Sequence, residues 1–345
     1  MGRSARLASV DALRGLTVAA MLVVNDPGDW GHVFAPLEHA AWHGCTPTDL
    51  IFPLFLFVVG VSIALGGPTT PRAVALRALR IVALGLVLHA VAHWALGTRE
   101  FRPMGVLQRI GICYGVVGVL ALYARPRAQW LVFGLLLCGY AALLACGGPL
   151  TKDGNLASRI DTLLLGRYAY EYDAATGLGH DPEGVLATLA AIATTLLGVR
   201  AGAWLRLGAV RTLWCAAGVA LLLGAAWAQW QPLNKQLWTS SFVLWSGGWA
   251  LAALALAHAV VDRAGAPPVG RALGVNAIAA YAGAWLAVCA LEGLHWSAPL
   301  YAALSAPLIP RVGAAGASLA YALAFTALWW MLMRVLAQRG VRIRI

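Results

Sequence analysis

The sequence predicts an all-α polytopic membrane protein with about ten transmembrane helices. Of its 345 residues, 61% are hydrophobic and only 11% are charged, and the mean hydropathy is +0.75. The apolar residues fall in repeated blocks approaching about 20 residues, the length that a hydrocarbon layer about 30 Å thick requires of a helix. Runs such as 51–65 and 131–145 are apolar on every face, whereas a barrel strand alternates apolar and polar residues. A water-soluble globule and a β-barrel are both excluded.

The hydropathy blocks define the individual spans. In order they are 7–25, 46–66, 80–96, 105–123, 130–146, 184–202, 212–230, 242–261, 272–291 and 314–335. Most connections are short, which favours antiparallel neighbours, and the pairs Gly111/Gly115 and Gly198/Gly202 would let helices approach closely. No internal repeat and no long linker divides the chain, so we expect a single transmembrane domain over residues 1–345.

The distribution of charge predicts the sidedness. Ten spans put both termini on one side of the membrane. Sixteen of the 25 basic residues, Arg3, Arg6 and Arg344 among them, fall on that side, whereas 11 of the 14 acids fall on the other. Under the positive-inside rule both termini are cytoplasmic. The net charge of +11 therefore reports topology, and we expect no nucleic-acid partner.

Three outer segments are too long and too polar to be simple turns: 25–45, 147–183 and 292–313. The first contains His39, whose imidazole could take a proton from an amine or carry an acyl group. An interfacial histidine beside aromatic residues is the alternative interpretation. The outer face is thus where a binding site could be built.

The same segment contains a possible set of metal ligands. His39, His43 and Cys45 would meet only on a helix, and Gly44 with Pro47 breaks any helix there. We expect no metal site. The six cysteines lie mostly within spans and include no CxxC pair, so we expect no disulfide framework.

Two acidic motifs have a structural explanation as helix caps. Thr46-Pro47-Thr48-Asp49 is close to a capping box at the head of the second span. Asp181-Pro-Glu183-Gly at the head of the sixth span is typical of a cap followed by proline and an acid at the positive end of the helix dipole. Capping and a functional role both stay open for these acids.

Charges inside spans need partners, because an ionised side chain near the bilayer centre costs about 2.5–3.5 kcal/mol. Asp11 and Arg14 are three apart on one helix face and can neutralise each other. Arg109 has no acid nearby in the sequence, so it must meet an acid from another helix or an anionic ligand. Asn234-Lys235 and Asn276 add donors suited to a sugar or phosphate, although each could also cap or join helices.

Seven motifs occur in a characteristic order. They are Asp11-Ala-Leu-Arg14-Gly15, Asn25, His39-Ala-Ala-Trp42-His43-Gly44 with Asp49-Leu-Ile-Phe-Pro53, Gly105-Val-Leu-Gln108-Arg109, Asp181-Pro-Glu183-Gly184, Asn234-Lys235-Gln-Leu-Trp238-Thr239-Ser240 and Gly274-Val-Asn276-Ala. In this order, from about residue 6 to residue 335, they resemble the heparan-α-glucosaminide N-acetyltransferase family. The resemblance implies a membrane-embedded enzyme that takes the acetyl group of cytosolic acetyl-CoA and gives it to an amino sugar on the far side. Bacterial relatives are associated with uptake and use of N-acetylglucosamine.

The resemblance also implies site residues. His39 becomes the catalytic histidine, as base or acetyl carrier, with Asn25 as its neighbour and Asp49 in the same group. Acetyl-CoA, the donor, is expected to contact Arg109 and Gln108, with Arg14 a weaker candidate. The residues expected to contact the sugar are Trp42, Glu183, Asn234 and Asn276.

The expected acceptor is a small, glucosamine-like sugar, because the family pattern starts almost at Met1, whereas the lysosomal enzyme carries a lumenal domain before its first span. The expected location is a bacterial inner (cytoplasmic) membrane. A hexosamine permease is the alternative function, but the outer histidine segment has no counterpart in the second half of the chain, as a transporter repeat would require. N- versus O-acetylation, direct transfer versus an acetyl-histidine, a supporting role for His43 and a homodimer all stay open.

Overall fold

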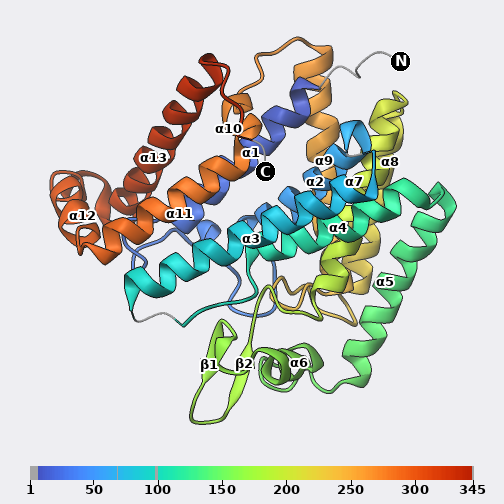
Figure 1. Ribbon diagram of the computed structural model, residues 1–345, viewed down its shortest axis with the longest axis horizontal. Coiled ribbons are helices and arrows are strands. Elements are labelled where there is room, and N and C mark those ends of the chain that lie inside the picture. Colours follow the sequence, from blue (N-terminus) through green and yellow to red (C-terminus); the bar gives the residue numbers. More distant parts are fainter. Residues whose placement is uncertain (1–6, 68, 98–99, 344–345) are drawn as a thin grey trace.

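The computed structural model describes residues 7–67, 69–97 and 100–343, which are almost entirely helical (Figure 1). Arg3, Arg6 and Arg344 lie outside these ranges. In chain order the elements are α1 (Ala8–Asn25), η1 (Ala35–Leu37), η2 (Pro47–Leu50), α2 (Ile51–Gly66), α3 (Pro71–Leu96), α4 (Val106–Tyr123), α5 (Pro126–Cys146), α6 (Leu156–Leu165), η3 (Gly166–Tyr168), β1 (Glu171–Asp173), β2 (Leu178–His180), α7 (Thr188–Arg206), α8 (Val210–Trp227), α9 (Ser240–Ala257), η4 (His258–Arg263, a π-helical turn), α10 (Arg271–Val275), α11 (Ala277–Gly293), α12 (Ser297–Ser305) and α13 (Ile309–Gln338).

The predicted all-α multi-pass fold is confirmed. Nine helices in the described ranges are long and apolar enough to cross a membrane, and α11 with α12, bent by 96° where they meet, makes up to ten. Every predicted span coincides with a helix.

Two predicted boundaries are wrong. The span 272–291 is not continuous, because Asn276 separates α10 from α11. The side-chain amide of Asn276 is hydrogen-bonded to the backbone of Val341 and Ile343. The sixth span, α7, begins at Thr188 instead of residue 184, because the acids before it are engaged in ion pairs and do not cap it.

Close helix packing depends on glycine, as the pairs in the sequence predicted. Of the candidate spans, α7 has the largest buried share, and it crosses α2 at Gly198. A Cβ atom at Gly198 would lie 2.0 Å from the carbonyl oxygen of Phe57, and one at Gly60 of α2 would lie 1.9 Å from that of Thr195. The two backbones therefore touch, as small residues at membrane helix crossings allow.

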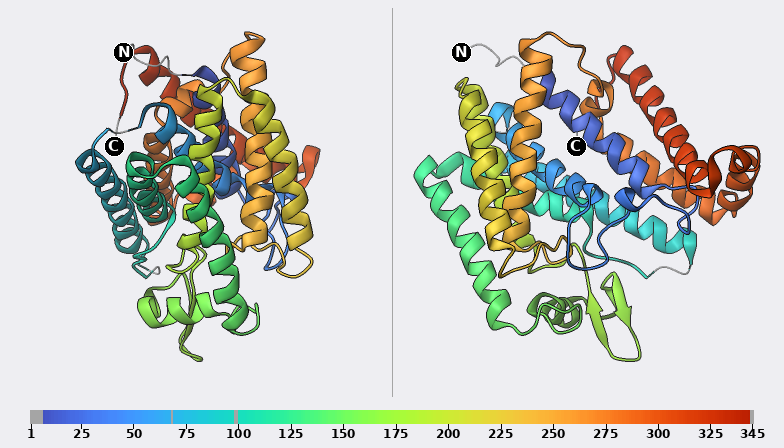
Figure 2. Two further views of the ribbon diagram at one scale, coloured as in Figure 1. Left: turned by 90° about the vertical axis from the view of Figure 1, so that its right-hand side faces the viewer. Right: turned by 180° about the vertical axis from the view of Figure 1, so that it is seen from behind.

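The long outer segment 147–183 has its own structure. It forms α6 and the antiparallel pair β1–β2, with Tyr172 opposite Gly179. Asn155 begins α6, its Oδ1 accepting from the Ser158 amide at 2.8 Å. Figures 1 and 2 show α6 and this hairpin together at one end of the long helices, with the start of α1 and the end of α13 at the other.

Sidedness is tested by single cysteines in a cysteine-depleted background. Asp153→Cys, in the exposed turn before α6, is expected to react with an impermeant thiol reagent added outside cells, and Arg127→Cys, exposed at the start of α5, to stay unlabelled until the membrane is opened. The reverse labelling pattern would contradict the cytoplasmic assignment of the termini.

Candidate functional site

His39 and Asp49 form a dyad where the outer segment meets the second span. The Nδ1 of His39 donates to Oδ1 of Asp49 at 2.7 Å. The carboxylate is almost fully buried, whereas the His39 side chain is 46% exposed. A carboxylate on Nδ1 fixes the tautomer and orientation of the ring, so that the lone pair able to accept a proton is on Nε2. The structure thus brings these two predicted residues together as a base and the group that orients it.

Asp49 is also the capping residue that the sequence predicted. Thr46 and Asp49 form a capping box at the start of η2. Oδ2 of Asp49 accepts from the amides of Thr46 at 2.9 Å and Ala40 at 3.1 Å, and Oδ1 is left for His39. One carboxylate therefore anchors the loop and orients the imidazole, so that capping and function are not alternatives here.

The connection between α8 and α9 covers the dyad. The Gly44 amide donates to the Leu233 carbonyl at 2.8 Å, which joins the two loops. Lys235 Nζ lies 3.1 Å from both ring nitrogens of His39 and 4.0 Å from Oδ1 of Asp49. The predicted sugar ligand Asn234 is fully buried, with Nδ2 3.3 Å from Nδ1 of His43.

Trp42 connects the dyad segment to the α6 region. Its Nε1 donates to the Leu150 carbonyl at 2.7 Å, and its ring meets His180 edge to face at 5.1 Å. Nδ1 of His180 lies 2.8 Å from Oγ of Ser158, and burial lowers the pKa of His180 to about 4, so the ring is neutral at physiological pH. His180 could not be predicted from the sequence, because nothing in a strand that short indicates which loop it will meet.

The expected sugar ligand Glu183 belongs to a buried ion-pair cluster. Arg102 donates through Nε to Oδ2 of Asp181 at 3.0 Å, and through Nη2 to both Asp181 and Glu183. Its guanidinium lies 4.4 Å from the centroid of the Tyr170 ring. Asp181 is therefore a partner of Arg102 and not the predicted helix cap. The role of Arg102 could not be predicted from the sequence, because it lies about 80 residues before its acids.

The predicted donor ligands Arg109 and Gln108 lie in the first turn of α4 and are fully buried. Nη2 of Arg109 donates to the Gly184 carbonyl at 3.1 Å, and its charge interacts with Glu183 and Asp181. Within the described ranges, Nε and Nη1 of Arg109 and both amide atoms of Gln108 have no hydrogen-bond partner. These two residues therefore retain unused donors and acceptors in the interior.

Two predicted residues are not drawn into the dyad. Asn25 is exposed at the end of α1, with no side-chain hydrogen bond to another described residue. Asn276 holds the segment after α13, donating to the Val341 carbonyl at 3.3 Å and accepting from the Ile343 amide at 2.9 Å.

A cavity of about 840 Å3 enters from the end of the molecule where α1 begins. Among the residues that the structure describes, its lining includes the arginines Arg14, Arg77, Arg80 and Arg342. Arg14 pairs with Asp11 at 2.9 Å, which confirms the predicted neutralisation, and also donates to Ser62 Oγ at 2.7 Å. Along α2 the lining runs from Gly66 to Phe55, six residues from Asp49, which corresponds to about 9 Å of helix. The cavity thus approaches the dyad from the opposite face.

The three possible metal ligands in the outer segment, His39, His43 and Cys45, face different partners. Nδ1 of His39 faces Asp49, Nδ1 of His43 faces Asn234, and Cys45 Sγ donates to the Thr46 carbonyl at 3.6 Å. Among the residues that the structure describes, no group of three or more His, Cys, Asp or Glu side chains is arranged to hold a metal.

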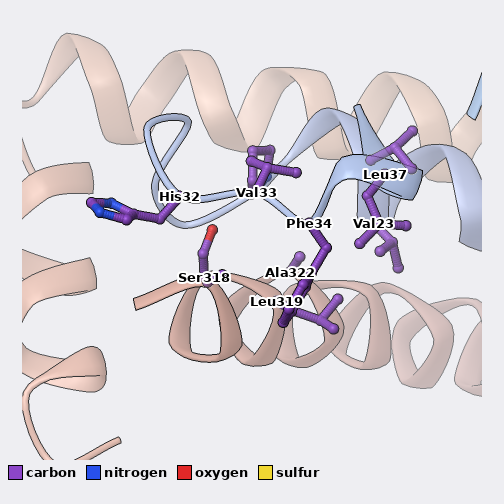
Figure 3. Close-up of a pocket in the computed structure, with 11 residues that line it drawn as sticks. Val23, His32, Val33, Phe34, Leu37, Ser318, Leu319 and Ala322 are labelled. Atoms are coloured by element: carbon purple, nitrogen blue, oxygen red, sulfur yellow. The ribbon is translucent and has the colours of Figure 1, made fainter. Parts of the chain in front are cut away.

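A second, much smaller pocket lies between the first outer segment and α13 (Figure 3). Its volume of about 10 Å3 has room for about one water molecule. Phe34, Leu37 and Leu319 supply much of its lining, and Oγ of Ser318 donates to the Asp29 carbonyl at 3.0 Å. This pocket is a small gap where the first outer segment packs against α13, and it is too small for a sugar.

Two kinds of comparison with known proteins point to the same enzyme name. A family model described as heparan-alpha-glucosaminide N-acetyltransferase, catalytic, matches residues 6–154. The chain is 31% identical to the heparan-alpha-glucosaminide N-acetyltransferase of Homo sapiens, over 75% of this chain and 49% of that protein. It is 30% identical to the protein of the same name from Mus musculus, over 75% of this chain and 50% of that protein. The chain therefore spans about half the length of the curated relatives it matches.

Proposed function

Because residues 6–154 match the family model described as heparan-alpha-glucosaminide N-acetyltransferase, catalytic, we propose that this multi-pass membrane protein transfers acetyl groups from acetyl-CoA to a small amino sugar at its outer face. The observation that carries the proposal is the His39–Asp49 dyad, faced by an arginine-lined cavity that enters from the other side of the molecule. We place the protein in a bacterial cytoplasmic membrane, with the cavity open to the cytoplasm.

The donor occupies the cavity. Its volume, about 840 Å3, is in the range of small-molecule sites, and four arginines suit the phosphates of a CoA nucleotide. Acetyl-CoA is too polar to cross the bilayer. Its thioester arm must therefore extend past Phe55 towards the dyad, while the nucleotide stays at the inner end.

The acceptor meets the thioester at His39. Nε2 takes a proton from the amine as its nitrogen bonds to the acetyl carbonyl carbon, and Asp49 stabilises the imidazolium. The C–S bond then breaks, the thiolate leaves with the bonding electrons, and a proton returns to it as CoA is released. Direct transfer is the simplest sequence with these residues.

The outer face suits a cationic acceptor. Its segments contain 11 of the 14 acids, among them Asp29 and the exposed Glu38 in the segment of His39, so an ammonium sugar is drawn towards the site. Glucosamine must lose a proton before its nitrogen attacks, so the rate should rise as pH increases through neutrality. Trp42, which lies in the histidine segment, and Asn234, whose Nδ2 faces His43, are assigned to the sugar.

The test uses detergent-solubilised protein with acetyl-CoA, with and without glucosamine. Free CoA should form only when the sugar is present, and mass spectrometry should find acetyl on nitrogen, with N-acetylglucosamine a poor acceptor. Binding of the sugar without CoA release would contradict the proposal and favour a permease. Acetyl on oxygen, with N-acetylglucosamine preferred, would contradict the amine specificity.

The donor assignment predicts the effect of changing the cavity arginines. Arg77→Gln combined with Arg80→Gln should weaken acetyl-CoA binding about tenfold or more, because each charged hydrogen bond to phosphate contributes about 1.5–3 kcal/mol. Isothermal titration with acetyl-CoA measures it. Arg127→Gln removes an exposed arginine of the same face that does not line the cavity, and should leave affinity unchanged. Equal affinity in the double variant and the parent would place the donor elsewhere.

A further inference from the structure

Lys235 has an unusual position over the His39 ring. Its Nζ is 3.1 Å from Nδ1 and 3.1 Å from Nε2. An ammonium in the ring plane at equal distances from both nitrogens would collide with Cε1, so Nζ lies over the ring face. Nδ1 already donates to Asp49 and has no lone pair to offer. The contact is therefore that of a cation with the π face of an imidazole.

The ammonium is not placed as a simple counter-ion of Asp49. The distance from Nζ to Oδ1 is 4.0 Å, well beyond the 2.7–2.9 Å of a charge-assisted hydrogen bond. The chain has only two lysines, Lys152 and Lys235, among its 25 Lys and Arg residues. The Lys235 ammonium therefore lies closer to the His39 ring than to the neighbouring buried carboxylate of Asp49.

The groups around Lys235 and His39 come from several elements. Lys235 interacts with Asp49 and Glu183, with the like charge of Arg109, and with Cys45. Burial lowers the pKa of Lys235, and the two acids act against this effect. His39 faces Asp49 and Lys235, and its chain neighbour Glu38 is exposed.

We infer that Lys235 is a positioning residue that keeps His39 in its uncharged, proton-accepting form between turnovers. The use of that form rests on the proposed function. A neutral imidazole accepts a cation on its face, whereas an imidazolium at 3.1 Å from an ammonium is repelled. The Asp49 carboxylate attracts a positive charge on the ring, and the Lys235 ammonium opposes it.

The decisive measurement does not depend on acetyl transfer. Diethyl pyrocarbonate reacts with unprotonated imidazole, and mass spectrometry of the His39 peptide gives the rate at each pH. In Lys235→Met the midpoint of this rate profile should move up by about one pH unit, making the reaction about tenfold slower on the acid side. Lys235→Arg, which keeps a cation, should retain the parent midpoint. Lys152→Met, which removes the other lysine from an exposed pair with Glu171, should also retain it.

A second variant guards against misfolding. Lys235→Gln keeps a polar side chain of similar reach and should give the same upward shift as Lys235→Met. The acid limb of kcat/KM should move with the chemical midpoint in both. Unchanged midpoints in folded Lys235→Met and Lys235→Gln would overturn the inference. Because the modification needs neither acetyl-CoA nor sugar, a shift in a protein that acetylates nothing would reject the proposed function alone.

Discussion

His39→Ala is expected to lower kcat for acetyl transfer by at least about 100-fold, the lower end of what a positioned general base contributes. The side chain is 46% exposed, and without it Asp49 still accepts from the Thr46 and Ala40 amides, so the melting temperature should stay close to that of the parent. Acetyl-CoA binding should also persist, since the cavity that we assign to the donor does not include His39.

Asp49→Asn separates the role of the dyad from that of the cap. The new amide oxygen must face the Thr46 and Ala40 amides, which leaves its NH2 group facing Nδ1 of His39. Nδ1 then has to accept, the proton moves to Nε2, and the base is lost although the loop is still capped. A fall in kcat approaching that of His39→Ala is expected, in a protein that still folds.

His43→Ala is the matched control for both variants. Its imidazole is four residues away in the same segment but faces Asn234. It should retain activity within about tenfold of the parent. Turnover of His39→Ala within tenfold of the parent would contradict the assignment of the base, and a larger loss in His43→Ala would move the assignment to that histidine.

Arg102→Met is expected to lower the free energy of unfolding by about 3–5 kcal/mol, the cost of removing one partner from a buried ion pair. Asp181 and Glu183 are buried, and Arg102 bonds to both. Without it, two carboxylates remain close together in the interior with no cation hydrogen-bonded to them. A fall of several degrees in the melting temperature in detergent measures the effect.

Lys152→Met is the control for Arg102→Met. It breaks an exposed pair with Glu171, whose side chains are 45% and 37% exposed, and should change stability by at most about 1 kcal/mol. Adding Asp181→Asn and Glu183→Gln to Arg102→Met removes the two carboxylate charges that Arg102→Met leaves without a partner. This triple variant should recover part of the lost free energy of unfolding. Equal melting temperatures for Arg102→Met and Lys152→Met would show that the cluster does not stabilise the fold.

The fold could be predicted from local pattern because the membrane imposes it. A chain in hydrocarbon must form its backbone hydrogen bonds within each helix. The length of each apolar block was therefore enough to predict the spans, and each of them coincides with a helix. The break at Asn276 could not be predicted, since its cause is a hydrogen bond to residues 65 and 67 positions away. The structure of α6 and the β1–β2 hairpin was missed because the outer segment is not subject to the hydrocarbon constraint.

By itself the sequence determined the all-helical membrane architecture, the capping box of Asp49 and the neutralisation of Arg14 by Asp11, all of which depend on neighbours a few residues apart. Only the tertiary structure decided that Asp49 orients His39, that Lys235 lies over the same ring and that Arg102 joins Asp181 and Glu183. These contacts join loops and helices that are 10 to 196 residues apart. A hydrophobic pattern fixes where each helix lies along the chain. It does not fix which charged side chains pair, because a buried charge needs a partner in the low-dielectric interior and that partner comes from a distant segment.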